Sequence, residues 1–366
     1  MTGQPRWVAT DTTGLVIATL TSLVPAGPLR RTMGRYESQT FTLTVDPKID
    51  PDWLYATTPM QGALICYTGD PGQEVIEWGG IVTRRKRGLS NVVELSAATP
   101  ECYLDRRYTG NYSVTGRDQN LIASDLVTLA TQGDADVPGS TGWPFRINVV
   151  GAAGTTRDRT YADQDDKTLY SALDELAHVI GGPQWMTGWE WTHGPERIRP
   201  VVTVGTRIGV AKTPGLSAPV TFTPPMMTSG TLDEDYAAGK GANLITAVSS
   251  GSGATRPQSS VGTLQAHRPV VEDRFTPSTS ITRVSTLTAH AQSQLATEAN
   301  GAQSLSFTVA RQGSPRLGVD WNVGDDIDVI LDGPTFPAPI TTTGQCIGVE
   351  VGADEITPYL ATSEGF

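Results

Sequence analysis

The sequence predicts a mainly β protein in which an α+β segment is inserted between two β-rich regions. Its 366 residues include 39 glycines and 25 prolines, a composition typical of short strands joined by turns. Short apolar runs bounded by turn residues fill the first hundred residues and return after residue 200, while helix-period patterns lie between them. The predicted domains are residues 1–105, a β-barrel; residues 106–200, the α+β insertion; and residues 201–366, a second β-barrel with a helix-containing insertion around 251–303.

Five short strand-like runs predict the first barrel. In the second run, Phe41, Leu43 and Val45 alternate with threonines, which is the pattern of a strand with one buried face. Five such runs in about 100 residues indicate a small barrel or sandwich. The runs are residues 14–20, 36–45, 62–68, 75–83 and 91–96.

Two helices and a hairpin are predicted in the insertion. Asp118 can cap a helix over 119–131, and Asp165 or Asp166 can open a second over roughly 167–180. The following QWMTGWEWTHG alternates tryptophans with other residues and pairs naturally with ERIRPVVTV as a hairpin. Beyond residue 200 the pattern predicts strands at 243–250, 304–310, 326–331 and 344–351, and a helix over 284–300.

The charge balance argues against a general nucleic-acid binder. The formal net charge is −11, whereas such a binder needs clustered Lys and Arg. The one basic run, Arg84-Arg85-Lys86-Arg87, lies between two strand-like runs. We interpret it as a charged hairpin tip or strand edge, with a nucleic-acid patch as the alternative. No window has the length of a membrane span and the N-terminus lacks an apolar signal core, so synthesis in the cytoplasm without export is expected.

Motifs of the common catalytic and metal sites are missing from the sequence. The four histidines have no zinc spacing, the three cysteines form no CxxC pair, and neither GxSxG nor GxxxxGK[ST] occurs. His193 follows the tryptophan-rich run and could serve a wall hydrolase, but no Cys or Asp stands at a hydrolase family's spacing. We therefore expect no catalytic residue, no metal and no cofactor.

Two clusters remain as candidate sites. The acidic run DWNVGDDIDVILD does not meet the calcium-loop template, because its glycine precedes the aspartates and no Glu follows. On a strand, Asp326, Asp328 and Asp332 share one face, which we expect to meet solvent, with a channel wall as the less certain alternative. Trp185, Trp189 and Trp191 share a face of the hairpin, and core or interface packing is favoured over a sugar-stacking platform.

The order of these features resembles the minor tail proteins of long-tailed phages (siphoviruses) of actinobacteria and, more distantly, the tail-hub or baseplate-hub family. The resemblance rests on an all-β start, then the helix TLYSALDELAHVIGG leading into QWMTGWEWTHG, and then GANLITAVSSGSG. The helix VSTLTAHAQSQLATEAN and the element VGDDIDV follow.

This resemblance implies two barrels similar to tail-tube subunits, and a homotrimer that places six barrels around a channel. Such a ring would continue or close the tail tube at the virion's tail tip, without enzymatic activity. It would contact a distal tail protein, a tape measure protein and other tail-tip or receptor-binding proteins. DNA would pass through at ejection without specific binding; three copies would carry about −33 formal charges, which repel phosphates. The alternatives are a cell-wall-degrading or carbohydrate-binding tip protein and a distal tail ring protein with one barrel per chain.

Overall fold

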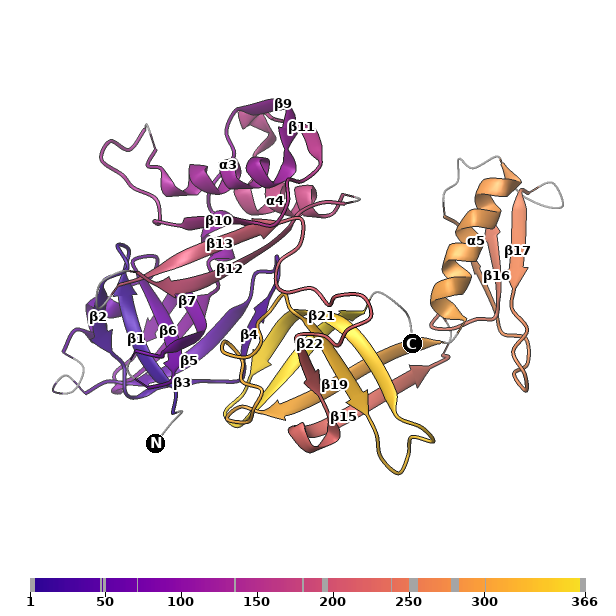
Figure 1. The fold of residues 1–366 in the computed structure, drawn as a ribbon. Coiled ribbons are helices and arrows are strands. Elements are labelled where there is room, and N and C mark those ends of the chain that lie inside the picture. Colours follow the sequence, from indigo (N-terminus) through magenta and orange to yellow (C-terminus); the bar gives the residue numbers. More distant parts are fainter. Residues whose placement is uncertain are drawn as a thin grey trace.

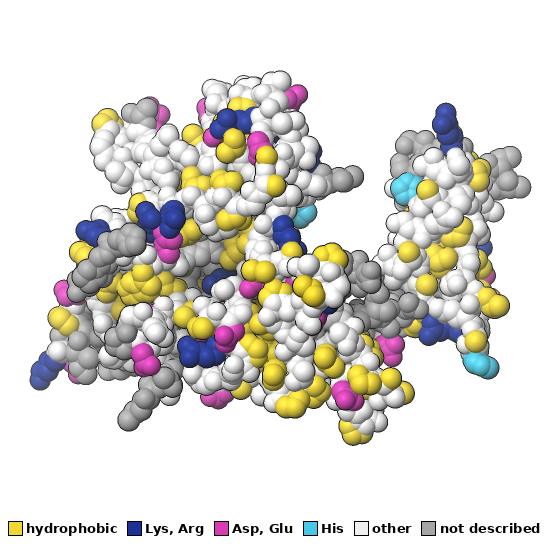
Figure 2. Space-filling model, in the orientation of Figure 1, with side chains coloured by type: hydrophobic (Ala, Val, Ile, Leu, Met, Phe, Trp, Pro, Cys, Tyr) yellow, Lys and Arg dark blue, Asp and Glu magenta, His cyan; other side chains and the backbone are white. Residues whose placement is uncertain are grey.

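The protein consists of two large sheets, an α+β insertion and a small lobe (Figure 1). The insertion lies over the N-terminal sheet, and the lobe stands apart beside the second sheet (Figures 1 and 2). The computed structural model describes residues 4–46, 48, 51–70, 72–134, 136–179, 181–192, 197–237, 239–249, 256–277, 283–299 and 301–362.

The N-terminal sheet has seven antiparallel strands in the order β2-β1-β6-β7-β8-β5-β3. Within β5, Phe41 and Leu43 are buried while the flanking threonines are exposed, as the alternation predicts. The strands are β1 (Arg6–Asp11), β2 (Val16–Thr19), β3 (Leu23–Pro25), β5 (Ser38–Thr44), β6 (Gly62–Thr68), β7 (Val75–Arg87) and β8 (Val92–Ala98). Two single-turn helices, α1 (Trp53–Ala56) and α2 (Glu101–Leu104), flank the sheet.

The insertion combines a three-stranded sheet, a two-stranded sheet and two helices. Helix α3 (Gln119–Thr131) begins where predicted, because the Asp118 side chain accepts from two backbone amides. Helix α4 (Leu169–Ala177) is shorter than predicted: Thr168 caps it, and Asp166 lies in the left-handed region at φ +48°, closing the turn η1 (Asp163–Asp165). The strands are β9 (Tyr112–Asp118) with β11 (Thr156–Tyr161), and β10 (Arg146–Val150), β13 (Ile198–Gly205) and β12 (Gln184–Trp191) in the order β10-β13-β12. Strands β12 and β13 form the predicted antiparallel pair.

The second large sheet follows the order β14-β20-β21-β22-β19-β15, and β4 (Leu29–Thr32) pairs with β21. Strand β4 comes from the N-terminal part of the chain, so the second sheet is completed by residues about 320 positions away, as the pair Arg30–Glu350 illustrates. The strands are β14 (Val220–Phe222), β15 (Met227–Asp235), β19 (Ala302–Ala310), β20 (Asp326–Leu331), β21 (Ile340–Val351) and β22 (Glu355–Thr362); the turn η2 (Pro224–Met226) precedes β15.

The lobe is a three-stranded sheet covered by one helix. Leu287 and Ala291 of α5 (Val284–Glu298) pack on Ile245 and Ala247 of the central strand, forming a core separate from the rest. The predicted helix over 284–300 is thus present as α5. The strands are β16 (Leu244–Val248), β17 (Gln258–Gly262) and β18 (Glu272–Phe275) in the order β17-β16-β18.

Two further cores lie on opposite faces of the N-terminal sheet. Leu64 in β6 belongs to a core shared with the second sheet, which includes Phe222 and Trp321. Its neighbour Ile65 belongs to a core shared with the insertion, which includes Trp185. Successive side chains of a strand point to opposite faces, so β6 packs on both neighbours at once. The N-terminal sheet therefore packs against the insertion on one face and against the second sheet on the other.

Candidate functional site

The boundary between the two large sheets contains a buried ion pair. The guanidinium of Arg311, which follows β19, pairs with the carboxylate of Glu77 on β7, and their side chains are 5 % and 7 % exposed. The Thr68 hydroxyl donates to Glu77 Oε1 at 3.0 Å, and Arg311 NH1 donates to the Gly352 carbonyl at 3.0 Å. Burial would lower the pKa of Arg311, but the contact with Glu77 raises it on balance. Arg311 therefore stays charged.

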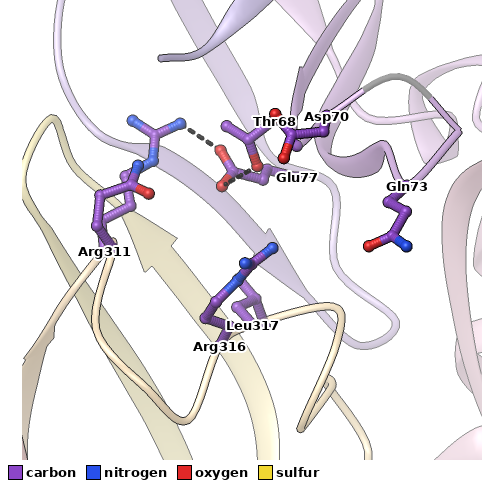
Figure 3. Close-up of a pocket in the computed structure, with 9 residues that line it drawn as sticks. Thr68, Asp70, Gln73, Glu77, Arg311, Arg316 and Leu317 are labelled. Carbon is purple, nitrogen blue, oxygen red and sulfur yellow. Dashed lines mark hydrogen bonds and ion pairs between the residues drawn. The ribbon is translucent and has the colours of Figure 1, made fainter. Parts of the chain in front are cut away.

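A small polar cavity of ≈ 40 Å³ adjoins this pair. In Figure 3, Thr68, Asp70 and Glu77 approach it from the N-terminal sheet, while Arg311, Arg316 and Leu317 approach from the second sheet. Its volume is that of one or two water molecules, so it cannot accept an organic substrate. The cavity is a feature of the boundary rather than a ligand site.

The insertion is fastened to the second sheet by the segment 206–218, which we call the strap. Arg207 NH2 lies 2.7 Å from Asp326 Oδ1, and Lys212 Nζ lies 2.8 Å from Asp328 Oδ1. The Ala218 amide also donates to Asp328 Oδ2 at 2.9 Å. Each carboxylate of β20 thus has a cation from the strap.

These contacts correct the expectation of a solvent-facing acidic strand. Asp328 is 5 % exposed and Asp326 half-buried, because the strap covers that face of β20, while Asp332, just beyond the strand, is exposed. Burial alone would raise the pKa of Asp328, but hydrogen bonds from Lys212, Thr343 and Ala218 lower it below its usual value. Alternation identified the shared face correctly, but the sequence gives no signal that residues 110 or more positions away cover it.

A pair of glutamines also connects the insertion to the second sheet. Gln184 Nε2 donates to Gln345 Oε1 at 2.7 Å, and Gln345 Nε2 donates back to Gln184 Oε1 at 2.9 Å. The backbones of the strap and the second sheet meet beside them, where a Cβ on Gly209, at φ +81°, would lie 2.1 Å from the Gly324 carbonyl carbon. Only glycine fits there. Neither glutamine belongs to a sequence motif, so the sequence alone does not mark them.

The three tryptophans of β12 do not form a common platform. Trp185 is 3 % exposed in the core beneath the insertion, and Trp189 is half-buried with its ring 6.3 Å from that of Trp143. Trp191 is 36 % exposed and stands edge-on to Tyr67 at 5.5 Å. A stacked sugar would therefore find one accessible ring instead of three. His193 lies outside the described residues.

A buried carboxyl group lies where α2 meets β12. Glu101 is 1 % exposed, and burial raises the pKa of its carboxyl to about 7, although hydrogen bonds from Thr99 and Thr187 oppose the shift. Thr187 belongs to β12, so the group sits between the N-terminal sheet and the insertion. A shifted carboxyl can mark a catalytic site. Here it is enclosed by packing rather than open to a substrate, and we interpret it as structural.

An open cleft of ≈ 780 Å³ lies where β4, α4, β12 and β22 meet. Its lining mixes apolar and charged side chains, among them Met33, Arg35, Glu37, Tyr170, His178 and Tyr359. His178 Nδ1 lies 3.2 Å from Asp174 Oδ1 at the end of α4, and the three cysteines are buried. Within the described ranges no group of three or more His, Cys, Asp and Glu could hold a metal ion, and no helix is long and apolar enough to cross a membrane.

Comparisons with known proteins give structural rather than sequence relatives. No protein-family profile matches the chain, and no curated protein matches it in sequence. The 43 kDa tail protein of prophage MuSo2 from Shewanella oneidensis superposes with a TM-score of 0.54 at 13 % identity, covering 98 % of both chains. A tail protein from Neisseria meningitidis MC58 superposes with a TM-score of 0.53 at 15 % identity, covering 98 % of this chain and 97 % of that one. Over its whole length, this mainly β chain with its α+β insertion therefore has the fold of these phage tail proteins.

Proposed function

We propose that this protein is a structural hub of a phage tail tip, in which three copies form a ring that continues or closes the tail-tube channel. The observation that carries the proposal is the whole-length fold shared with two phage tail proteins. In the proposed ring each chain supplies two barrel-like sheets, so that three chains present six around the channel. The source we propose is a siphovirus of actinobacteria, with the protein made in the host cytoplasm.

The contacts between the parts of the chain suit a structural role. The Glu77–Arg311 pair, the strap contacts to Asp326 and Asp328, and β4 in the second sheet all connect parts that are remote in sequence. A single rigid body is what a subunit needs in order to hold a channel at fixed width. The insertion and the lobe then offer surfaces for neighbours, which we propose include a distal tail protein, a tape measure protein and receptor-binding proteins.

We propose that DNA passes the ring without specific binding. The net charge of −11 opposes contact with phosphates. Asp326 and Asp328 contribute little to this repulsion, because Arg207 and Lys212 neutralise them. Asp332, just beyond the end of β20, remains exposed. On the face drawn in Figure 2, acidic side chains are scattered among uncharged ones. We therefore attribute the repulsion to the net charge of the whole chain rather than to one acidic patch.

The alternatives receive less support from the chain. A distal tail ring protein would bring one barrel per chain, whereas two seven-stranded sheets are present among the described residues. A carbohydrate-binding tip would need accessible aromatic rings, and two of the three tryptophans of β12 are buried or half-buried. We therefore propose no enzymatic activity.

Microscopy of assembled tail tips tests the proposal. Purified virions carrying an affinity-tagged copy of this chain are imaged, and density that fits the two sheets is counted around the tail axis. We expect three copies at the tip, surrounding the channel. Six copies would indicate a distal ring protein instead, and reproducible release of sugar or peptide from host cell-wall material by the purified protein would indicate a wall hydrolase.

A further inference from the structure

The hairpin formed by β7 and β8 ends in an exposed basic and apolar tip. Arg84, Lys86 and Arg87 are exposed, and Leu89, at the turn, is fully exposed. We call residues 84–92 the basic tip. The basic run thus lies on the β7 arm of a hairpin, next to its turn, and the apolar Leu89 lies at the turn itself.

The cations of the basic tip are only partly compensated. Lys86 pairs with Glu94 at 3.0 Å, while no ion pair of Arg84 or Arg87 is present within the described ranges. Arg85 donates to a backbone carbonyl and to threonine hydroxyls of the α1 region rather than to a carboxylate. The positive charges of the tip lie close together and repel one another. They are concentrated there although the protein as a whole has a net charge of −11. An acidic partner would relieve this repulsion.

The exposed Leu89 indicates that this partner is a protein surface. A protein binds a polynucleotide through cations and through aromatic rings that stack on bases. Leu89 is aliphatic and provides neither kind of contact. A protein surface with carboxylates around an apolar contact would satisfy both features of the tip.

The same chain carries a surface of that kind on its insertion. Asp163, Asp165 and Asp166 are exposed in the turn before α4, and within the described part of the chain none of them has an ion-pair partner. Tyr108, 58 % exposed, lies on the segment that bridges to Thr168, the cap of that helix. We call Asp163, Asp165, Asp166 and Tyr108 the acidic turn. Its one neighbouring lysine, Lys167, is already paired with Glu175.

We propose that the basic tip of one copy docks on the acidic turn of a second copy. Arg84 and Arg87 face the aspartates, and Leu89 packs on the ring of Tyr108. Because the two surfaces differ, the contact is head-to-tail and repeats from copy to copy, closing into a ring when the rotation allows. The docking itself stands on the charges and exposure described above; closure into a ring rests on the proposed hub function.

Charge reversal tests the contact. The tip-reversed variant carries Arg84→Glu and Arg87→Glu, and the turn-reversed variant carries Asp163→Lys and Asp165→Lys; Asp166 is kept because its φ of +48° suits aspartate. Self-association is measured by sedimentation velocity over a concentration series in low and high salt. We expect wild-type association that weakens with salt, and at least about a tenfold weaker association for either variant alone.

Mixing the variants provides the decisive observation. An acidic tip can dock on a basic turn and a basic tip on an acidic turn, so an equimolar mixture should associate where neither variant does. A chain with all four substitutions should also regain self-association. Arg274→Glu with Arg283→Glu is the matched control, since both side chains are exposed on the lobe, away from both surfaces, and the charge change is that of the tip-reversed variant. Unfolding temperatures establish that each variant is folded.

Three results would overturn the proposal: wild-type protein that stays monomeric at every concentration, a tip-reversed variant that associates as well as wild type, or a mixture that fails to associate. Binding of a 20-base-pair DNA duplex that the tip reversal abolishes would reassign the tip to nucleic acid. Virion microscopy separates this proposal from the hub function. Three copies around the tail axis, unaffected by the reversals, would retain the hub and reject this contact.

Discussion

Glu77 and Arg311 lie 234 positions apart in the chain and form a buried ion pair across the boundary between the two large sheets. Neither charge can be removed alone without leaving the other in a protein interior. The pair therefore makes the position of one sheet relative to the other sensitive to single substitutions.

Removing one member of this pair should be costly. Arg311→Met leaves the Glu77 carboxylate buried without its cation, and we expect the free energy of unfolding to fall by about 3–5 kcal/mol. The double variant Glu77→Leu/Arg311→Met removes both charges and should recover most of that loss. Urea unfolding followed by tryptophan fluorescence measures both. Equal losses in the single and double variants would contradict a coupled pair.

Asp328 should stabilise the fold through the strap, in contrast to the neighbouring Asp332. Asp328→Asn weakens the contact with Lys212, and we expect a loss of about 1–3 kcal/mol. Asp332→Asn, one residue beyond the end of β20 and exposed, is the control and should change stability little. Because the pKa of Asp328 is lowered in the folded state, its contribution is present above its unfolded pKa and is lost as the pH falls through the folded value. The difference between the two variants should therefore shrink in acid, as urea midpoints at several pH values would reveal.

Glu101 should make stability fall between mildly acidic and neutral pH. Its folded pKa of about 7 lies above the ordinary value of 4.5, so the folded state holds its proton more tightly than the unfolded state does. Its stabilising contribution is complete below 4.5 and is lost as the pH rises through about 7. Glu101→Gln cannot ionise and should gain up to roughly 3 kcal/mol relative to wild type between pH 5 and 8. Parallel pH profiles of the two proteins would contradict this.

The three cysteines should be unreactive in the folded protein. Cys66, Cys102 and Cys346 are buried, and burial raises the pKa of each thiol to about 12. The reactive thiolate is therefore scarce at pH 8, and the reagent has no access. A disulfide-exchange reagent should label none of them in native protein and all three after unfolding in guanidinium. Rapid labelling of native protein would show that the cores open readily.

Much of the secondary structure depends on neighbouring residues and was therefore predictable. The burial and partners of the site residues depend on contacts between parts that are far apart in the sequence. The alternation around Phe41 and the cap at Asp118 each act within a few residues, and both predictions are confirmed. The start of α4 was misplaced because Asp166 and Thr168 are both good helix-start residues, and backbone conformation decided between them. The burial of Asp328 could not be predicted, since its cover comes from Lys212 and Ala218, whose positions depend on how the insertion packs. The fold itself was predicted from the order of elements, and the shared fold of two tail proteins confirms it.

Strand β4 has a mechanical consequence. It leaves the N-terminal part of the chain and hydrogen-bonds to β21, so a pull along the strand loads those bonds in shear, where several must break together. A hinge between the two large sheets would have to tear this strand away and expose the Glu77–Arg311 charges at the same moment. If such chains surround a passage, as proposed, movement of whole chains would widen it without breaking these contacts, whereas bending within a chain would break them.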